Sequence, residues 1–260
     1  MTYALLFTGF SLSIARADER LFTYTYEADV LPKGGMEFEQ WITHRHGKDD
    51  GTFSRWDLRE ELEYGLTPKL TTALYLNTTS TYSSNVKNHE NRNRFEFDGI
   101  SSEWKYQLLN PNEKPVGLLL YGEGRYSGTE AELEEKIVLQ HNFGSKWTLA
   151  LNGTVEQEWK FEDDSTQFEG AIELSGGLAY KINTHWSVGL EGRNHRVLAD
   201  FQRQTADAWF MGPAIHYGRS AWWATLTVMP QITGHPETTS GLELDEHERI
   251  EARLIVGLNF

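Results

Sequence analysis

Long stretches of this sequence alternate strictly between apolar and polar residues, and this pattern limits the fold more than any other feature. Between residues 53 and 66, for example, Trp56, Leu58 and Leu62 share one face of a strand and Arg59 lies on the other. A period of two indicates a β-strand and excludes a helix. Many stretches run to ten residues or more. That is longer than an average strand of a soluble sandwich, and it suits a tilted strand that crosses a membrane.

The chain divides into twelve such stretches. They are predicted at 36–44, 53–66, 70–79, 95–109, 116–127, 130–143, 147–161, 167–182, 186–198, 208–217, 222–233 and 246–260. Because the number is even, the first strand begins and the last strand ends on the same side of the sheet. The predicted fold is therefore all-β, a closed antiparallel transmembrane β-barrel of about twelve strands.

The connections between these stretches are of two kinds. Short turns, rich in turn-forming residues, have aromatic residues beside them, which is typical of a girdle at a membrane interface. Longer, charged connections are predicted at 45–52, 80–94, 199–207 and 234–245. Outer-membrane barrels have short periplasmic turns and longer outer loops, so the longer connections are predicted to face outward.

Two strands interrupt the alternation. Glu60 falls on the apolar face of its strand, and the strand at 95–109 places Phe97 in phase with Glu103. A β-bulge inserts one residue and shifts the faces of a strand, so a bulge is expected near each of these positions.

Composition supports a barrel and excludes several other classes. The 260 residues carry a net charge of −14 and no Cys, and 13% of them are aromatic. The mean hydropathy is only −0.53, as expected when every second residue of a strand meets lipid. The acidic balance argues against a nucleic-acid partner. No phosphate loop, dinucleotide motif or haem motif is present, and we expect neither a cofactor nor a bound metal.

The two ends of the chain carry signals of export and assembly. Residues 1–17 are interpreted as a signal peptide, because an apolar stretch precedes Ala15-Arg16-Ala17, although no Lys or Arg comes before it. The last strand has an apolar face that ends at Phe260. It resembles the closing strand of outer-membrane barrels, whose terminal aromatic residue is read by the barrel-assembly machinery. The predicted surroundings are outer-membrane lipid and lipopolysaccharide.

Three stretches resemble a known family. They are 27–35, which reads EADVLPKGG, 212–217, which reads GPAIHY, and 222–231, which reads WWATLTVMPQ. They are similar to outer-membrane barrels grouped with the phenol meta-pathway degradation proteins and related transporter-like barrels. The resemblance implies a single exported barrel that passes a solute or a hydrophobic compound, and it carries over no catalytic motif. The predicted organisation is 18–35 as a periplasmic or lumen segment and 36–260 as the barrel.

The polar faces of the strands predict a charged lumen. The candidate lumen-lining residues are Arg55, Arg59, Glu61, Glu63, Glu123, Arg125, Glu156, Glu158, Glu169, Glu173, Glu191, Arg193, Glu251 and Arg253. Side chains fill a barrel of about eight strands, and sixteen to eighteen leave an aqueous channel, so twelve lies between these cases. The leading hypothesis is passive or facilitated passage of a small solute through an acidic lumen. The alternative is a closed structural or adhesive barrel that acts through its outer loops at 80–94 and 234–245.

A third hypothesis, an outer-membrane hydrolase, depends on histidines. His44 and His46 lie near Asp49 and Asp50 at the first outer connection. Two histidines fall short of a metal site, and no Gly-x-Ser-x-Gly motif is present. The main expectation is therefore a protein that is not an enzyme.

Overall fold

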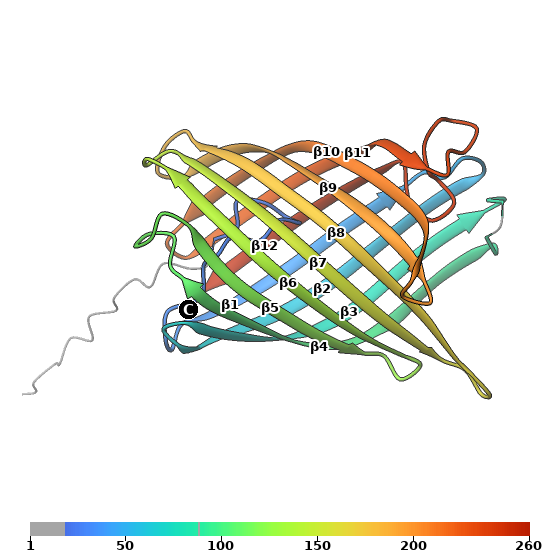
Figure 1. Cartoon of the computed structure of the whole chain (residues 1–260), viewed down its shortest axis with the longest axis horizontal. Helices are drawn as coiled ribbons and strands as arrows, with labels where there is room; N and C mark the ends of the chain where they lie inside the picture. Colours follow the sequence, from blue (N-terminus) through green and yellow to red (C-terminus); the bar gives the residue numbers. More distant parts are fainter. Residues whose placement is uncertain (1–18, 88) are drawn as a thin grey trace, which may run out of the picture.

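Twelve antiparallel strands form a closed barrel (Figure 1). The computed structural model describes residues 19–87 and 89–260, and the predicted signal peptide lies outside the described residues. The strands are β1 (Met36–His46), β2 (Thr52–Thr67), β3 (Leu70–Ser84), β4 (Arg92–Leu109), β5 (Gly117–Tyr126), β6 (Glu130–Phe143), β7 (Trp147–Phe161), β8 (Thr166–Lys181), β9 (Trp186–Ala199), β10 (Arg203–Arg219), β11 (Trp222–His235) and β12 (Ile250–Asn259). No helix among the described residues is long and apolar enough to cross a membrane. The predicted twelve-stranded barrel is confirmed.

The barrel closes where its first and last strands meet. Each strand pairs with its neighbours in the sequence, and β1 pairs with β12 in ten consecutive positions, from Glu37 opposite Asn259 to His46 opposite Ile250. The barrel wall therefore begins and ends on the same side, which we call the periplasmic end. The other end, at the right of Figure 1, is the outer end.

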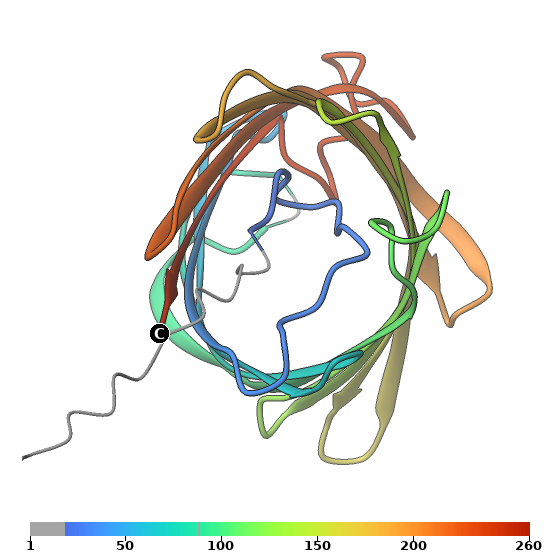
Figure 2. The same ribbon diagram turned by 90° about the vertical axis from the view of Figure 1, so that its left-hand side faces the viewer.

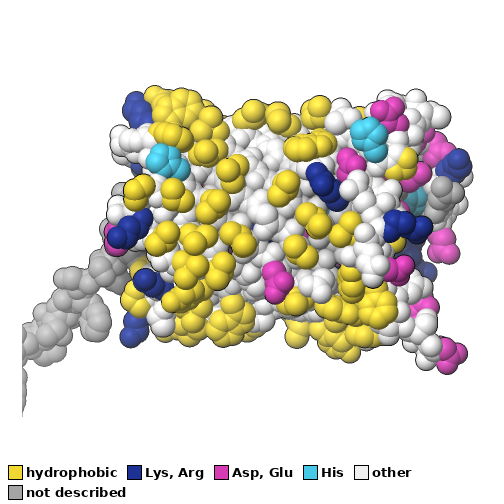
Figure 3. All heavy atoms as spheres, in the orientation of Figure 1, with side chains coloured by type: hydrophobic (Ala, Val, Ile, Leu, Met, Phe, Trp, Pro, Cys, Tyr) yellow, Lys and Arg dark blue, Asp and Glu magenta, His cyan; other side chains and the backbone are white. Residues whose placement is uncertain are grey.

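The outer surface of the barrel is apolar. Along β8, Leu174 and Leu178 are 49% and 43% exposed, whereas Glu173 and Ser175 on the opposite face are buried. Figure 3 shows apolar side chains over most of the wall, with charged side chains gathered mainly at the two ends. An apolar surface of this extent is unfavourable in water, so it lies in the hydrocarbon of the outer membrane.

Aromatic side chains mark the periplasmic edge of this surface. The rings of Trp147 and Tyr180 lie 4.8 Å apart, and Tyr217 contacts both Trp186, at 4.7 Å, and Trp222, at 5.2 Å. These residues lie beside short turns on neighbouring strands. They form the interfacial girdle that amphipathic rings favour at the level of lipid headgroups.

The long outer connection predicted at 199–207 is wrong. β9 ends at Ala199 and β10 begins at Arg203, which pairs with it, so only a tight turn separates the two strands. Asp200 and Phe201 form this turn with positive φ angles of 53° and 58°. The polar residues that suggested a loop belong to strand ends that extend beyond the membrane, where water favours polar side chains on both faces.

The bulge expected in the fourth strand is confirmed. Asn77 lies opposite Gly99 while Thr78 lies opposite Phe97, so Asp98 has no counterpart on β3. The extra residue reverses the faces of β4. As a result, Phe97 points to lipid and Glu103 is buried in the lumen.

The bulge expected at Glu60 is wrong. Glu60 pairs in unbroken register with Gln40 on β1 and Leu76 on β3, so its side chain lies on the outer face. The side-chain amide of Gln40 donates a hydrogen bond of 3.3 Å to the Glu60 carboxylate. A carboxylate in the middle of β2 thus faces lipid with one polar neighbour.

Replacing Glu60 with Leu is expected to stabilise the barrel by roughly 1 kcal/mol, because an acidic residue on the lipid face costs less than Arg or Lys but is still unfavourable. Urea unfolding in lipid vesicles measures the change, with Glu90→Leu in an outer connection as the control. A lower unfolding midpoint for Glu60→Leu would contradict the assignment of this face to lipid.

Candidate functional site in the barrel lumen

A segment before the first strand lies inside the barrel. Figure 2 looks into the barrel from its periplasmic end and shows this segment, in blue, crossing the lumen. Five of its hydrophobic side chains are at most 6% exposed, namely Phe22, Tyr24, Tyr26, Ala28 and Leu31. We call residues 19–31 the lumen plug.

A single carboxylate holds the middle of the lumen plug. Glu191 on β9 accepts hydrogen bonds from three successive backbone amides, those of Thr23 at 3.2 Å, Tyr24 at 2.7 Å and Thr25 at 2.6 Å. The Thr227 hydroxyl donates a further bond of 2.8 Å to the same carboxylate. Bonds to a charged acceptor are stronger than those between neutral groups, so Glu191 is the main polar anchor of the plug.

Neutral side chains from the wall bind the rest of the plug backbone. Asn152 accepts from the amide of Tyr26 at 2.6 Å and donates to its carbonyl at 3.0 Å. Gln140 accepts from the amide of Ala28, and Gln107 donates to the carbonyl of the same residue. The plug backbone is therefore satisfied by side chains, without joining the sheet as a strand.

Small residues of the wall make a socket for Phe22. Its ring packs against Ala150, Ala179 and Ala214. A Cβ atom added at Gly177 would lie 2.5 Å from the ring, which is closer than any real contact. The wall is thus shaped to this side chain at a position where no larger residue fits.

The two plug tyrosines contact cations of the wall. The Arg253 guanidinium lies 3.8 Å from the centre of the Tyr24 ring, and the Lys136 ammonium lies 4.1 Å from that of Tyr26. The Tyr24 hydroxyl donates a hydrogen bond of 2.7 Å to Glu251. Cation–π contacts of this kind are stronger away from water, so they add to the attachment of the plug.

The lumen plug separates two cavities. The outer chamber, of about 410 Å³, is lined by Tyr24 and Tyr26 on the plug side. The periplasmic vestibule, of about 1030 Å³, is lined by Leu21, Glu27 and Asp29. Different residues of the plug thus line the two cavities, and the plug is the partition between them.

The structure brings eight of the fourteen predicted lumen residues to the outer chamber. These are Arg55, Arg59, Glu156, Glu158, Glu169, Glu173, Arg193 and Arg253. The others line neither cavity: Glu61, Glu63, Glu123, Glu191 and Glu251 are buried, and Arg125 is partly buried. Phe260 lies exposed at the end of the chain, and its predicted role in assembly remains a prediction.

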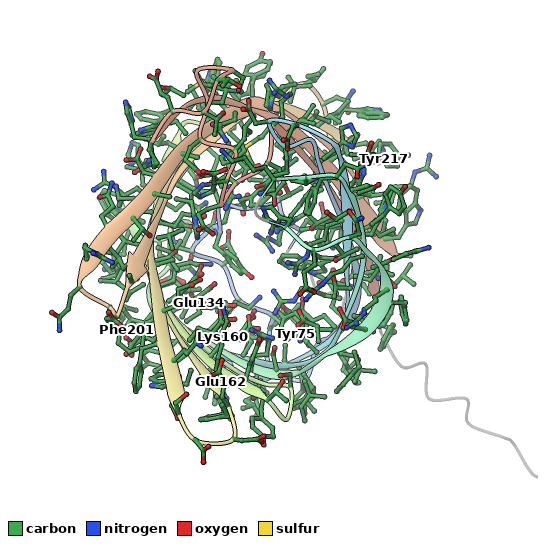
Figure 4. The ribbon with its side chains drawn as sticks, turned by 90° about the vertical axis from the view of Figure 1, so that its right-hand side faces the viewer. Tyr75, Glu134, Lys160, Glu162, Phe201 and Tyr217 are labelled. Atoms are coloured by element: carbon green, nitrogen blue, oxygen red, sulfur yellow. The ribbon has the colours of Figure 1, made fainter. Side chains whose placement is uncertain are left out.

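Sequence reasoning missed several charged lumen residues. They are Glu37, Glu39, Arg45, Glu103, Lys105, Glu132, Glu134 and Lys136. Figure 4 looks in from the outer end and shows Glu134 and Tyr75 pointing into the lumen, with Phe201 and Tyr217 outside. On β6 a partial signal was present, because Glu132, Glu134 and Lys136 alternate with Ala131, Leu133 and Ile137, although Glu135 interrupts the apolar face.

The connection between β11 and β12 folds inward and forms the roof of the outer chamber. Glu246, His247 and Glu248 line the chamber from this side. The carboxylate of Glu243 accepts hydrogen bonds from the His247 ring and backbone and from the amide of Glu246. Burial alone would raise the pKa of Glu243, but these bonds hold it below its ordinary value.

His195 on β9 attaches this roof to the barrel wall. Its Nδ1 atom lies 2.9 Å from Nε2 of His247, so one ring donates to the other. From the neighbouring outer connection, the Lys48 ammonium donates to the backbone carbonyls of His247 and Asp245. The chamber is therefore bounded by the roof at its outer side and by the lumen plug at its inner side.

A cluster of carboxylates lies buried in the wall formed by β1 and β2. Glu39 and Glu61 face each other across the strands, and their oxygens and one of Glu63 lie within 4.8 Å of one another. Lys105 pairs with Glu63. Neither oxygen of Glu61 has a hydrogen-bond donor among the described residues. This donor set could hold a cation, although like charges in such a cluster also repel.

The histidine site proposed for a hydrolase is not assembled. His44 lies on the outer face of β1, where its Nε2 atom is 2.9 Å from the Ser54 hydroxyl and its ring stacks on Trp56. Asp49 binds Thr239 instead, and Asp50 accepts from the amide of Lys87. The predicted residues therefore point to different partners.

The barrel is similar to solved outer-membrane proteins. The COG4313 outer membrane channel from Pseudomonas putida F1 superimposes with a TM-score of 0.65 at 12% identity, covering 90% of this chain and 98% of that one. The NanC porin gives a TM-score of 0.54 at 9% identity, covering 86% of this chain and 98% of that one. The KdgM porin gives a TM-score of 0.51 at 9% identity, covering 86% of this chain and 99% of that one. At such identities the likeness concerns the fold, and the fold is that of an outer-membrane β-barrel.

Within that class, the chain belongs to a family of unknown function (DUF6662), whose model matches residues 14–260. A comparison of this chain with curated proteins finds no match. These findings support an outer-membrane barrel family but give no support to a grouping with the phenol meta-pathway proteins.

Glu191→Gln is expected to loosen the lumen plug while leaving the barrel intact. The side-chain amide would place a donor among three backbone donors and so weaken their hydrogen bonds. We expect the free energy of local opening to fall by about 2 kcal/mol, which raises the population of the open plug more than tenfold. Hydrogen exchange of the amides of residues 23–25 measures it, with heat-modified electrophoretic mobility as the check on folding. Unchanged exchange at these amides would contradict the anchoring role of Glu191.

Glu61→Gln is the matched variant, and we expect it to stabilise the protein. Its new amide can donate to neighbouring carboxylate oxygens, and the change removes one of several like charges. We expect the free energy of unfolding to rise by roughly 1 kcal/mol. Hydrogen exchange of the amides of residues 23–25 should not change. A marked loss of stability would show that Glu61 has a bound cation or proton as its partner.

Proposed function

We propose that this protein is an outer-membrane channel for a small polar solute, with the lumen plug as its internal gate. One observation carries the proposal. A chamber on the outer side and a vestibule on the periplasmic side are separated by residues 19–31. Displacement of this segment would join the two cavities into one path.

The way in which the plug is attached supports a gate. Its backbone amides bind single side chains such as Glu191 and Asn152, and they form no continuous ladder with a strand. Such contacts break one at a time, at about 0.5–3 kcal/mol each. Removal of a whole strand from the sheet would instead break the closure of the barrel. Movement of the plug therefore costs less than removal of a strand.

The charged lining favours a polar solute over a hydrophobic one. The outer chamber is lined by eight carboxylates and six Lys or Arg side chains, and its roof and walls expose few apolar groups. A hydrophobic compound would have to displace water from these charges and leave them unsolvated. The hydrophobic-compound passage that the family resemblance implied is therefore not the function that we propose.

The same lining supports a modest preference for cations. Carboxylates outnumber bases among the residues that line the outer chamber, and rings of carboxylates favour cations in other pores. Because many of these charges form ion pairs, such as Arg193 with Glu173 at 2.6 Å, the preference should be weak.

Gly177→Leu tests the gate. A side chain at this position would occupy the place of the Phe22 ring, so the plug should detach and the time spent open in planar bilayers should rise at least tenfold. Gly124→Leu is the control, because nothing lies within 4 Å of a Cβ atom added there. Equal, silent bilayers for both folded variants would show a closed barrel and support the structural or adhesive alternative.

Glu156→Gln tests the ion preference. Glu156 lines the outer chamber whereas Glu61 does not, so Glu61→Gln is the matched control. Under a salt gradient, the reversal potential of Glu156→Gln should move toward that of a nonselective pore, and Glu61→Gln should keep the wild-type value. The reverse order would contradict the path assigned to the ions.

A further inference from the structure

The charges of the outer chamber are sorted by side. One wall carries six carboxylates from β6, β7 and β8, namely Glu132, Glu134, Glu156, Glu158, Glu169 and Glu173. The other carries four guanidinium groups from β12, β1 and β2, namely Arg253, Arg45, Arg55 and Arg59. In the closed order of twelve strands, β7 lies six places from β1, so these walls face each other across the lumen.

Two bases lie in or beside the acidic wall, and one of them, Arg193 on β9, pairs with Glu173. Lys136 on β6 binds Glu134 at 2.9 Å and lies over the Tyr26 ring, so it offsets one of the six carboxylates. The basic wall contributes no carboxylate to the lining of the chamber. Behind the lining of that wall, Asp57 and Glu251 pair with Arg45. The segregation of charge therefore concerns the groups that line the chamber, with guanidinium groups on one side and most carboxylates on the other.

Most of these charges already have close partners. Glu173 pairs with Arg193 at 2.6 Å and Glu132 with Arg125 at 2.8 Å. On the basic side, Arg45 pairs with Asp57 at 2.8 Å. In such pairs the opposite charges largely offset each other, and their hydrogen-bonding capacity is used within the wall.

Glu156 and Arg253 differ from the others. Within residues 19–87 and 89–260, the ionic neighbour of Glu156 is His195, at 4.0 Å. Arg253 has no carboxylate within 4.0 Å in the same ranges. It donates instead to the Thr43 hydroxyl at 2.8 Å and the Thr23 carbonyl at 3.2 Å. Each wall thus offers one charged group that is not closely ion-paired.

We propose that the outer chamber binds a small zwitterionic solute, with its cationic group at Glu156 and its anionic group at Arg253. The inference rests on the proposed channel function and names the class of solute. A zwitterion can pair with Glu156 and Arg253 at once, whereas a singly charged solute pairs with one of them and is repelled by the other. The chamber, at about 410 Å³, is in the range of small-molecule sites, and the tyrosine rings of the plug offer an apolar floor.

The test measures binding to the folded full-length chain in detergent by isothermal titration calorimetry. The probes are 4-aminobutyrate and 6-aminohexanoate, and the singly charged analogues are hexanoate and hexylamine. At least one zwitterion should bind ten or more times more tightly than either analogue, and the preference should weaken at high salt. Equal binding of all four probes would overturn the proposal.

Variants locate the two groups. Glu156→Gln and Arg253→Gln should each reduce zwitterion binding at least tenfold, Arg253→Lys should keep most of it, and Glu61→Gln should leave it unchanged. Wild-type binding in Glu156→Gln or Arg253→Gln would overturn the assignment. The heat-modified electrophoretic mobility of each variant verifies the fold, and Arg253→Lys separates charge from shape.

Channel recordings distinguish the failure of this inference from the failure of the proposed channel function. Zwitterion binding by a protein that stays silent in bilayers, even when Gly177 is replaced by Leu, would overturn the channel and leave the binding chamber. An open channel that binds and passes the zwitterions no better than hexanoate or hexylamine would overturn the chamber and leave the channel.

Discussion

The structure depends on the closure of its sheet between β1 and β12. Within lipid no water satisfies the backbone, so every amide and carbonyl of the wall needs a partner on a neighbouring strand. The ten pairs from Glu37 to His46 supply these partners at the one place where strands distant in sequence meet. Closure then fixes the two faces of every strand, with one face in lipid and the other in a shared lumen.

A lumen of this size sets a second problem, which the lumen plug solves. Twelve strands enclose more volume than their own side chains fill. The plug occupies the middle of that volume and places its buried residues, such as Phe22 and Tyr26, against the wall. Its backbone binds polar side chains that the strands direct inward, above all Glu191. The same arrangement divides the remaining space into a chamber and a vestibule, and this division suggests a gate.

The sequence predicted the barrel well because lipid makes the alternation of residues strict. Glu156 and Arg253 were assigned to the lumen for the same reason. Glu103 was not, because the bulge at Asp98 reverses the faces of β4. The outer turn at 200–202 was also missed, since strands that extend beyond the membrane lose their apolar face. The pattern therefore fails where the surroundings of a strand change.

The plug and its anchors could not be predicted in this way. The backbone amide of Thr23 and the carboxylate of Glu191 are 168 positions apart in the sequence. Asn152 and Gln140 resemble ordinary polar lumen residues, and Gly177 carries no sign of the ring that it accommodates. These contacts follow from the closed shape of the barrel, which brings all strands around one axis. The local sequence describes each strand but does not specify what lies between the strands.

The most direct measurement joins the plug to the wall and then releases it. The chain has no Cys, so Phe22→Cys with Gly177→Cys creates a single pair where the Phe22 ring meets the wall. Peptide mapping verifies the crosslink, and the single-cysteine variants are the controls. In one planar bilayer, the oxidised protein should be silent and a reductant should start a steady current. The same current before and after reduction of a verified crosslink would contradict the account, because the path would then bypass the lumen plug.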